Sequence, residues 1–452
     1  MPDPIRWANG NFLVGLLESE IQPAMGCTEV GAAALAAAKA AEVLDGVPDR
    51  LRLIVSPNVY KNGIAAGIPG THLKGLACAV ALGALIRRSH LGLNILDGVN
   101  QSDAAAAERF VRSDNVRVDF DPNASDPVFL QAEATASGHS ARATICRRHS
   151  RIVEVRRDGE RLGLDALSDD TGEEETSLSR LTGFQVRDLI RDVTTMDTLA
   201  LGFLLEAART NREAAMADFE NGRSSLGPAL RTLTQGQASC TAMVGKVQTM
   251  TAAASEARMR GFPVPVYALS GSGNHGITAF VGIDIVAEEL GADDERRSRA
   301  LALASILAIY VKAQTGRLTS YCGCAIAPAT GVAAATVYLL GGSIEAMVQA
   351  MQSVIGTFSG MLCDGAKLSC AYKVSTVAAA AVQFAHLALQ DAFVPCGDGI
   401  VGRTIEETIR NLGILNNPGM KETDRVILGL LREPDVILQE SKQASAVHQP
   451  GT

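Results

Sequence analysis

Cysteine is the residue type with the widest chemistry in this chain, and four of its nine cysteines lie within about fifty residues. Cys322 and Cys324 occur in SYCGCAIAP, and Cys363 and Cys370 occur in SGMLCDGAKLSC. We expect all four at helix ends, where unpaired backbone N–H groups stabilise a thiolate or an anionic cluster. Their spacing matches neither ferredoxin nor paired zinc patterns. The residues alone leave three interpretations open, namely metal ligation, core packing and incidental thiols.

Cys27 is separate from these four in sequence, in PAMGCTE at the start of an Ala-rich segment. The N-terminus of a helix lowers the pKa of a thiol and favours the thiolate. This position indicates a base or a nucleophile. The alternative is a small residue in a tight turn.

Two glycine-containing loops precede expected helices, GSGNHG (271–276) and PGTHLKG (69–75). Glycines allow backbone N–H groups to approach a carboxylate or phosphate at a helix N-terminus. A third segment, SPNVYKNG (56–63), offers further polar side chains. His275 could act in proton transfer. Each of these segments could also be an ordinary turn, and a loop histidine is more often structural.

The elements that must position these residues fall into two kinds. Residues 115–165 alternate with period two and predict a small antiparallel sheet, joined to a strand in 49–62. Residues 12–45 predict two helices broken at Pro23–Gly26, and 169–176 an acidic linker. The remaining chain predicts helices over 180–218, 226–257, 277–290, 294–315, 325–340, 344–358, 369–391 and parts of 403–440.

These patterns predict an α+β protein with a large, mainly α-helical catalytic domain and a smaller α+β domain carrying an antiparallel sheet. The expected division is residues 1–46 as N-terminal helices packing on the catalytic domain, 47–175 as the α+β domain, 176–440 as the helical domain with the cysteine site, and 441–452 as a disordered tail.

Composition limits the classes of function. The net charge is −8, and no basic stretch interleaved with aromatic residues supports nucleic-acid binding. The N-terminus lacks a signal-peptide pattern, so we expect a cytoplasmic protein without structural disulfides. Residues 325–342 carry no charge but are rich in small residues, which favours a buried helix over a membrane span. With only 4% aromatic residues, the core must pack through close helix–helix contact, which often extends into a homo-oligomer interface.

Taken together, the motifs resemble the L-cysteine desulfidase family, a family of otherwise uncharacterised proteins related to the α domain of bacterial iron–sulfur L-serine dehydratases. The resemblance covers residues 23 to about 380. It is carried by PAMGCTE, SPNVYKNG, GIPGTHLKG, SEARMRGFPVPVYALSGSGNHGI, GADDERRSRALALA and GTFSGMLCDGAKLSCAYKVSTVAAAA.

The resemblance implies an oxygen-sensitive lyase with a [4Fe–4S] cluster held by three cysteines. Cys363 and Cys370 match two of these ligands. The third follows the R-L-x-x-x element, here RLTSYC, which indicates Cys322, with Cys324 as the competing residue two positions on. Cys27 matches the cysteine proposed as the catalytic base. His275 stands where the family loop usually reads Gln, in GSGNQG.

The implied reaction is β-elimination of sulfide from L-cysteine to give pyruvate, ammonia and hydrogen sulfide. L-Serine dehydration is the closest alternative, and a cluster-bearing redox sensor is an alternative of another class. The two glycine loops would hold the substrate carboxylate through backbone N–H groups, with polar side chains completing the pocket. The expected substrate-binding residues are Asn58, Lys61, Asn62, Gly70, Thr71, Ser272, Gly273, Asn274 and His275.

Overall fold

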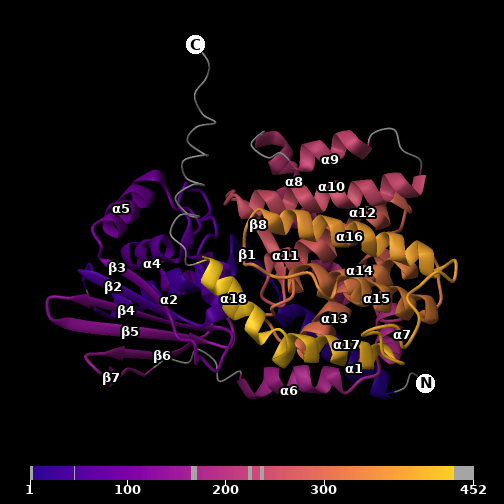
Figure 1. The fold of residues 1–452 in the computed structure, drawn as a ribbon, viewed down its shortest axis with the longest axis horizontal. Helices are drawn as coiled ribbons and strands as arrows, with labels where there is room; N and C mark the ends of the chain where they lie inside the picture. Colours follow the sequence, from indigo (N-terminus) through magenta and orange to yellow (C-terminus); the bar gives the residue numbers. More distant parts are fainter. Residues whose placement is uncertain (1–3, 45, 164–170, 222–225, 235–238, 432–452) are drawn as a thin grey trace, which may run out of the picture.

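The computed structural model describes residues 4–44, 46–163, 171–221, 226–234 and 239–431. Within these residues, buried apolar side chains form two clusters. One cluster lies between a six-stranded sheet and its helices, and the other fills a larger helical part (Figure 1). The predicted α+β class, with a large helical part and a smaller part carrying a sheet, is confirmed.

The smaller part contains a sheet in the order β3-β2-β4-β5-β6-β7. Its strands are β2 (Arg50–Val55), β3 (Val116–Phe120), β4 (Phe129–Ala136), β5 (His139–Cys146), β6 (Ile152–Arg157) and β7 (Glu160–Arg161). Alternation directs Leu130, Ala132 and Ala134 of β4 into the core. The predicted antiparallel pairing is confirmed except that β3 runs parallel to β2. The chain reaches β3 through helices, the crossover that a parallel pair needs.

The helix α2 (Thr28–Leu44) packs against β4 and β5 and also against α4 (Gly75–Ile86). These two helices approach closely at Gly83, where a Cβ atom would lie 2.0 Å from the backbone oxygen of Ala34. The predicted use of small residues for close helix contact is therefore confirmed here. The other helices of this part are α3 (Pro57–Gly63), η1 (Ser89–Asn94) and α5 (Gln101–Arg112).

The first two helices belong to different cores. The helix α1 (Pro4–Glu20) contributes Leu13 and Leu17 to the larger cluster, whereas α2 contributes to the smaller one. We expected residues 1–46 to pack together on the helical domain, and only α1 does so. The Ala side chains of α2 leave it thin enough to be buried between the sheet and α4. The domain boundaries themselves stay a prediction.

A short strand separates these two helices. The segment β1 (Ile21–Met25) pairs antiparallel with β8 (Pro265–Leu269), with Pro23 opposite Tyr267. The sequence predicted only a helix break here. The burial of β1 does not alternate, and its partner is distant in sequence, so no local pattern indicated a strand.

The larger part is helical. It consists of α1, α6 (Thr171–Thr182), α7 (Val186–Thr194), η2 (Leu199–Leu201), α8 (Gly202–Asn221), α9 (Leu226–Thr234), α10 (Ser239–Met259), α11 (Gly273–Gly276), η3 (Ile277–Val281), α12 (Gly282–Glu289), α13 (Asp294–Thr315), α14 (Gly323–Leu339), α15 (Ile344–Phe358), α16 (Ser369–Ala388), α17 (Ile405–Ile414), η4 (Leu415–Gly419) and α18 (Lys421–Leu431).

The predicted helices 294–315 and 344–358 are confirmed to the residue. The predicted helix 180–218 is wrong as one unit, because the chain breaks after Thr182 and again near Asp197, whose carboxylate accepts the N–H of Leu199. The acidic segment 169–176 is helical from Thr171, and its first two residues lie outside the described residues.

The helix α14 is buried against α13, α15 and α16, which agrees with the prediction of a core helix for the uncharged segment. Within the described ranges, no helix combines the length and apolar character needed to cross a membrane.

The last described helix, α18, runs along the boundary between the two parts and contacts α3 (Figure 1). Together α17 and α18 account for the amphipathic helices predicted after residue 403. Residues 432–440 and the predicted disordered tail, 441–452, lie outside the described residues.

Candidate active site

One cavity lies where the two parts meet, and five cysteines contribute to its wall. The wall combines the start of α2, the end of α3, the loop after β5, the loop before α11, the end of α13, the start of α14 and the loop before α16. The lining residues that could bind or react are Cys27, Thr28, Glu29, Asn62, His149, Arg258, Ser270, Ser272, Asn274, His275, Lys312, Arg317, Thr319, Cys322, Cys324, Cys363 and Cys370. The structure therefore brings together all the cysteines singled out from the sequence.

A short backbone bridge holds two of these cysteines side by side. Tyr321 pairs antiparallel with Leu362. The N–H of Cys322 donates to the carbonyl of Met361 at 2.6 Å, and the N–H of Cys363 donates to the carbonyl of Ser320 at 2.8 Å. This bridge joins the segment before α14 to the loop before α16. Two cysteines about forty residues apart in sequence therefore lie on neighbouring backbone segments.

Cys370 lies in the first turn of α16 and points back toward the same loop. Its thiol donates to the carbonyl of Gly365 at 3.4 Å, and its N–H donates to the carbonyl of Lys367 at 2.9 Å. Burial first, and then the neighbouring Cys324 thiol, raises the pKa of Cys370 to about 12. Burial and the thiols of Cys324, Cys363 and Cys370 likewise raise the pKa of Cys322 well above its ordinary value.

Cys324 differs from the other three in its contact. Its sulfur lies 3.3 Å from the hydroxyl of Ser272, in the glycine loop before α11. Within the described ranges the thiol of Cys322 has no such loop contact, and Cys322 precedes α14 with its N–H bonded across the bridge. Of the two competing residues, Cys324 therefore faces the loop predicted to bind substrate.

The donor set fits an iron–sulfur cluster. Burial favours the protonated thiols of Cys322 and Cys370, and metal binding would replace those protons, because only the thiolate ligates. Among the described residues, no three His, Cys, Asp or Glu side chains converge on the position of a single metal ion. A four-iron cluster does not need such convergence, since each thiolate binds its own iron. Lys373 beside Asp364 adds positive charge near Cys322 and Cys370.

Cys27 is a thiol rather than the expected thiolate. It donates to Oε2 of Glu29 at 2.8 Å. Burial, reinforced by the negative charge of Glu29, raises the pKa of Cys27 well above its ordinary value. The predicted lowering by the helix N-terminus is therefore wrong, because desolvation and the nearby carboxylate outweigh it.

Glu29 was missed in the sequence, although it lies two residues after Cys27 in the same motif. Its Oε1 accepts from Asn62 at 2.9 Å and lies 3.8 Å from Nε2 of His149. Burial favours its neutral form, but His149 and the donors Cys27 and Asn62 outweigh burial and lower the pKa of Glu29. The resting pair is thus a thiol hydrogen-bonded to a carboxylate. His149 comes from the loop after β5, where no local pattern indicated a role.

The glycine loop before α11 contributes three of its four predicted residues to the lining, namely Ser272, Asn274 and His275. Gly273 instead makes room for a guanidinium, because a Cβ atom there would lie 2.4 Å from Nε of Arg258. Asn274 accepts from Nη1 of Arg258 at 3.3 Å. The N–H of Ser272 is already bonded to the carbonyl of Leu269. One backbone donor of the predicted cradle is therefore already used, and side chains of the loop line the cavity beside it; the cradle itself stays a prediction.

His275 is buried, and its Nδ1 lies 3.0 Å from the carbonyl of Leu269. A carbonyl oxygen can only accept a hydrogen bond, so Nδ1 carries the proton and Nε2 is unprotonated. Burial, together with the charge of Lys312, lowers the pKa of His275 to about 3. His275 is therefore a neutral, fixed side chain, the structural alternative of the two considered.

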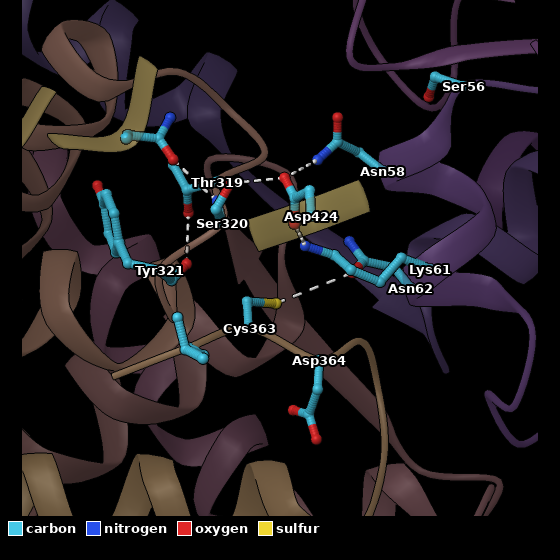
Figure 2. Close-up of polar contacts among 12 residues, drawn as sticks. Ser56, Asn58, Lys61, Asn62, Thr319, Ser320, Tyr321, Cys363, Asp364 and Asp424 are labelled. Atoms are coloured by element: carbon cyan, nitrogen blue, oxygen red, sulfur yellow. Dashed lines mark hydrogen bonds and ion pairs between the residues drawn. The ribbon is translucent and has the colours of Figure 1, made fainter. Parts of the chain in front are cut away.

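The other predicted substrate residues lie away from the cavity, with the exception of Asn62. Gly70 donates its N–H to the carbonyl of Gly261, and the hydroxyl of Thr71 donates to the carbonyl of Ile68, so both stabilise their own loop. Lys61 and Asn58 instead meet Asp424 of α18, as Figure 2 shows.

A family model and several curated proteins each match most of the chain. A family model described as the serine dehydratase alpha chain matches residues 90–429. A "UPF0597 protein" of Methanocella arvoryzae is 44% identical over 421 residues, which cover 93% of this chain and 98% of the relative. Proteins of the same name from Alkaliphilus oremlandii and Parabacteroides distasonis are 35% identical over 93% of this chain, and 98% and 97% of their own lengths.

Proposed function

The chain belongs to the family of serine dehydratase α chains, and on this premise we propose that it is an iron–sulfur-dependent lyase that removes sulfide from L-cysteine. Membership of the family indicates a lyase. The finer assignment gives pyruvate, ammonia and hydrogen sulfide as products, with one water consumed. The observation that supports it most is the single cavity in which the Cys27–Glu29 pair faces the same space as four clustered cysteines.

We assign Cys322, Cys363 and Cys370 as the ligands of a [4Fe–4S] cluster. The backbone bridge fixes Cys322 beside Cys363, and Cys370 points into the same loop. Cys324 is held by Ser272 and is left as the cysteine nearest the substrate loop. When bound, a cluster with three protein ligands supplies an iron that acts as a Lewis acid toward the leaving group.

The Cys27–Glu29 pair provides the proton chemistry. The Cys27 sulfur removes the α-proton of the substrate as its own proton moves to Glu29 through the 2.8 Å hydrogen bond, so no free thiolate has to form first. The C–S bond then breaks, and sulfide leaves with the proton held by Glu29. This returns Cys27 to the thiol and Glu29 to the carboxylate. Free aminoacrylate tautomerises and is hydrolysed to pyruvate and ammonia.

L-Serine dehydration is the second candidate, because the matching family model is described as a serine dehydratase chain. The same pair would remove the α-proton, and water would leave in place of hydrogen sulfide. The residues that line the cavity serve either leaving group. The two reactions are separated by their products rather than by the fold.

The test is anaerobic purification with iron and sulfide analysis, followed by assays of pyruvate and hydrogen sulfide with L-cysteine and L-serine. We expect an iron-loaded protein that turns over L-cysteine faster. Cys363→Ala should lose the cluster absorbance, whereas Cys78→Ala, half-buried in the smaller core, should keep it. A protein without iron would reject the cluster. A loaded protein that turns over neither amino acid would favour the redox sensor.

A further inference from the structure

Lys312 carries a buried positive charge that has no hydrogen-bond partner among the described residues. It lies near the end of α13 with 4% of its surface exposed, and its Nζ makes no hydrogen bond within the described part of the chain. The side chain lines the cavity. A buried charge without a partner is strongly destabilising, because its desolvation is not compensated. Such a charge persists where a ligand completes it.

The space in front of this ammonium is kept open by a glycine. A Cβ atom on Gly323 would lie 3.1 Å from Nζ of Lys312, 2.9 Å from the hydroxyl of Thr319 and 3.7 Å from Nε2 of His275. These three polar groups therefore surround one point at the start of α14. A side chain at position 323 would fill the space that a ligand needs.

The charges of the cavity do not balance. Its described lining contains three cationic side chains, of which Arg317 is paired with Glu20 at 2.8 Å. Among the residues that the structure describes, Lys312 and Arg258 have no carboxylate partner. The single lining carboxylate, Glu29, is held by Cys27 and Asn62. The side chains of the cavity thus carry an excess of positive charge, which the thiolates of a bound cluster and the anionic group of a substrate would offset together.

We propose that Lys312 binds the α-carboxylate of the substrate. This inference rests on the proposed lyase function for the identity of the ligand, and it moves the carboxylate from the loop backbone, where the sequence placed it, to a side chain. An ammonium–carboxylate contact in a site closed to water is a charge-assisted hydrogen bond, which is about twice as strong as a neutral one. Lys312 would thereby select α-amino acids over amines that carry the same leaving group.

The competing partner for Lys312 is the cluster itself. A different lysine, Lys373, already lies next to the expected cluster ligands. It donates to the carbonyl of Leu362, beside Cys363. It is also the cation that most favours the thiolates of Cys322 and Cys370. Lys312 interacts most strongly with Cys324, on the side of the glycine loop, and less strongly with Cys363 and Cys322. The two lysines thus differ in the thiol that each affects most.

The test compares two ligands that differ only in the carboxylate. We would measure binding of 3-mercaptopropionate and 3-mercaptopropionamide to the iron-loaded protein by anaerobic calorimetry. Both ligands carry the same thiol, so a contact of sulfur with iron contributes equally to the two affinities and drops out of their ratio. The wild type should bind the acid about ten- to a hundredfold more tightly, the usual value of one charged hydrogen bond. Lys312→Met should remove this preference, and Lys312→Arg should restore part of it.

Two controls separate the roles. Lys246→Met, at an exposed pair with Glu289, should leave the acid–amide preference unchanged. Lys373→Met should lower the iron content. Lys312→Met should leave the iron content unchanged and raise KM for L-cysteine about tenfold or more.

Equal binding of the acid and the amide by the wild type would overturn the proposal without any variant. Loss of iron in Lys312→Met equal to that in Lys373→Met would also overturn it, since the ammonium would then serve the cluster. If the protein turns over neither amino acid but keeps the preference for the acid, the proposed function fails and the assignment of Lys312 stands.

Discussion

Two buried lysines in this molecule have opposite surroundings. Lys61 has 1% of its surface exposed, and its ammonium lies 2.5 Å from Asp424, which also accepts from Asn58 and Ser320. Lys312 is buried to nearly the same extent, and its ammonium has no hydrogen-bond acceptor in the described part of the chain. The paired ammonium of Lys61 joins two elements of the fold, whereas we assign the unpaired ammonium of Lys312 to a ligand. The sequence favoured Lys61 for the substrate and did not single out Lys312.

The paired lysine belongs to a junction between the two parts of the molecule. Asp424 of α18 accepts from Lys61 and Asn58 of α3 on one side and from Ser320 on the other (Figure 2). Ser320 in turn accepts the N–H of Cys363. We expect the cavity to control turnover and this junction to control stability.

The largest effect should come from the cavity. Replacing Cys27 by Ala removes the base, and we expect turnover to fall by about 10²- to 10⁴-fold, the usual contribution of general base catalysis. Cluster absorbance and the free energy of unfolding should stay close to those of the wild type. Cys146→Ala, at the end of β5, is the matched control and should keep full turnover. Substantial turnover in Cys27→Ala would reject it as the base.

The junction should respond to Asp424→Asn. This change leaves the Lys61 ammonium buried without its counter-charge, and we expect the free energy of unfolding to fall by about 3 kcal/mol. Urea denaturation measures this loss. The same change at Asp188, in an exposed pair with Arg191, should cost below about 1 kcal/mol. The double variant Lys61→Met/Asp424→Leu should recover part of the loss, and equal effects at both aspartates would contradict the distinction.

Acid stability should depend on His275. Its pKa is about 3 in the folded protein, below the ordinary value, so below pH ~6.5 the unfolded chain binds a proton that the folded chain does not. The free energy of unfolding should therefore fall as the pH falls from 6.5 toward 3, by at most about 1.4 kcal/mol per unit. His275→Gln should flatten this slope in pH-dependent urea titrations. An unchanged slope would show that other groups dominate.

The smallest effect should distinguish the two glycine loops. Thr71→Val removes a hydrogen bond within its own loop, and we expect the free energy of unfolding to fall by about 1 kcal/mol with KM for L-cysteine unchanged. Ser272→Ala lies at the cavity and should raise KM by about tenfold at most. A higher KM in Thr71→Val would return that loop to the substrate site.

The cysteines were predictable because their chemistry is rare and their motifs are long. Cys322, Cys363 and Cys370 could be named together from a resemblance, and the structure places them along one cavity. The protonation of Cys27 was not predictable in this way, because it depends on burial and on the carboxylate of Glu29. The position of Cys27 at a helix N-terminus, taken alone, predicted a lowered pKa.

The loops show why sequence form is a weak guide to location. GSGNHG and PGTHLKG have the same loop-then-helix pattern, yet only the first lines the cavity. What distinguishes them is the long-range pairing of β1 with β8, which holds the first loop next to the start of α2. No local pattern records that pairing. The sheet was predictable from alternation, but the parallel placement of β3 depends on the helical crossover.

The hydrogen bond from Ser320 to Asp424 also bears on how the protein is made. A ribosome delivers Lys61 first, then Ser320 and Cys363, and Asp424 only after them. The turn that carries the cysteines therefore remains unsupported by α18 during most of translation. For the proposed cluster, iron would meet an incomplete site on a nascent chain, and we expect insertion only after α18 has emerged and docked.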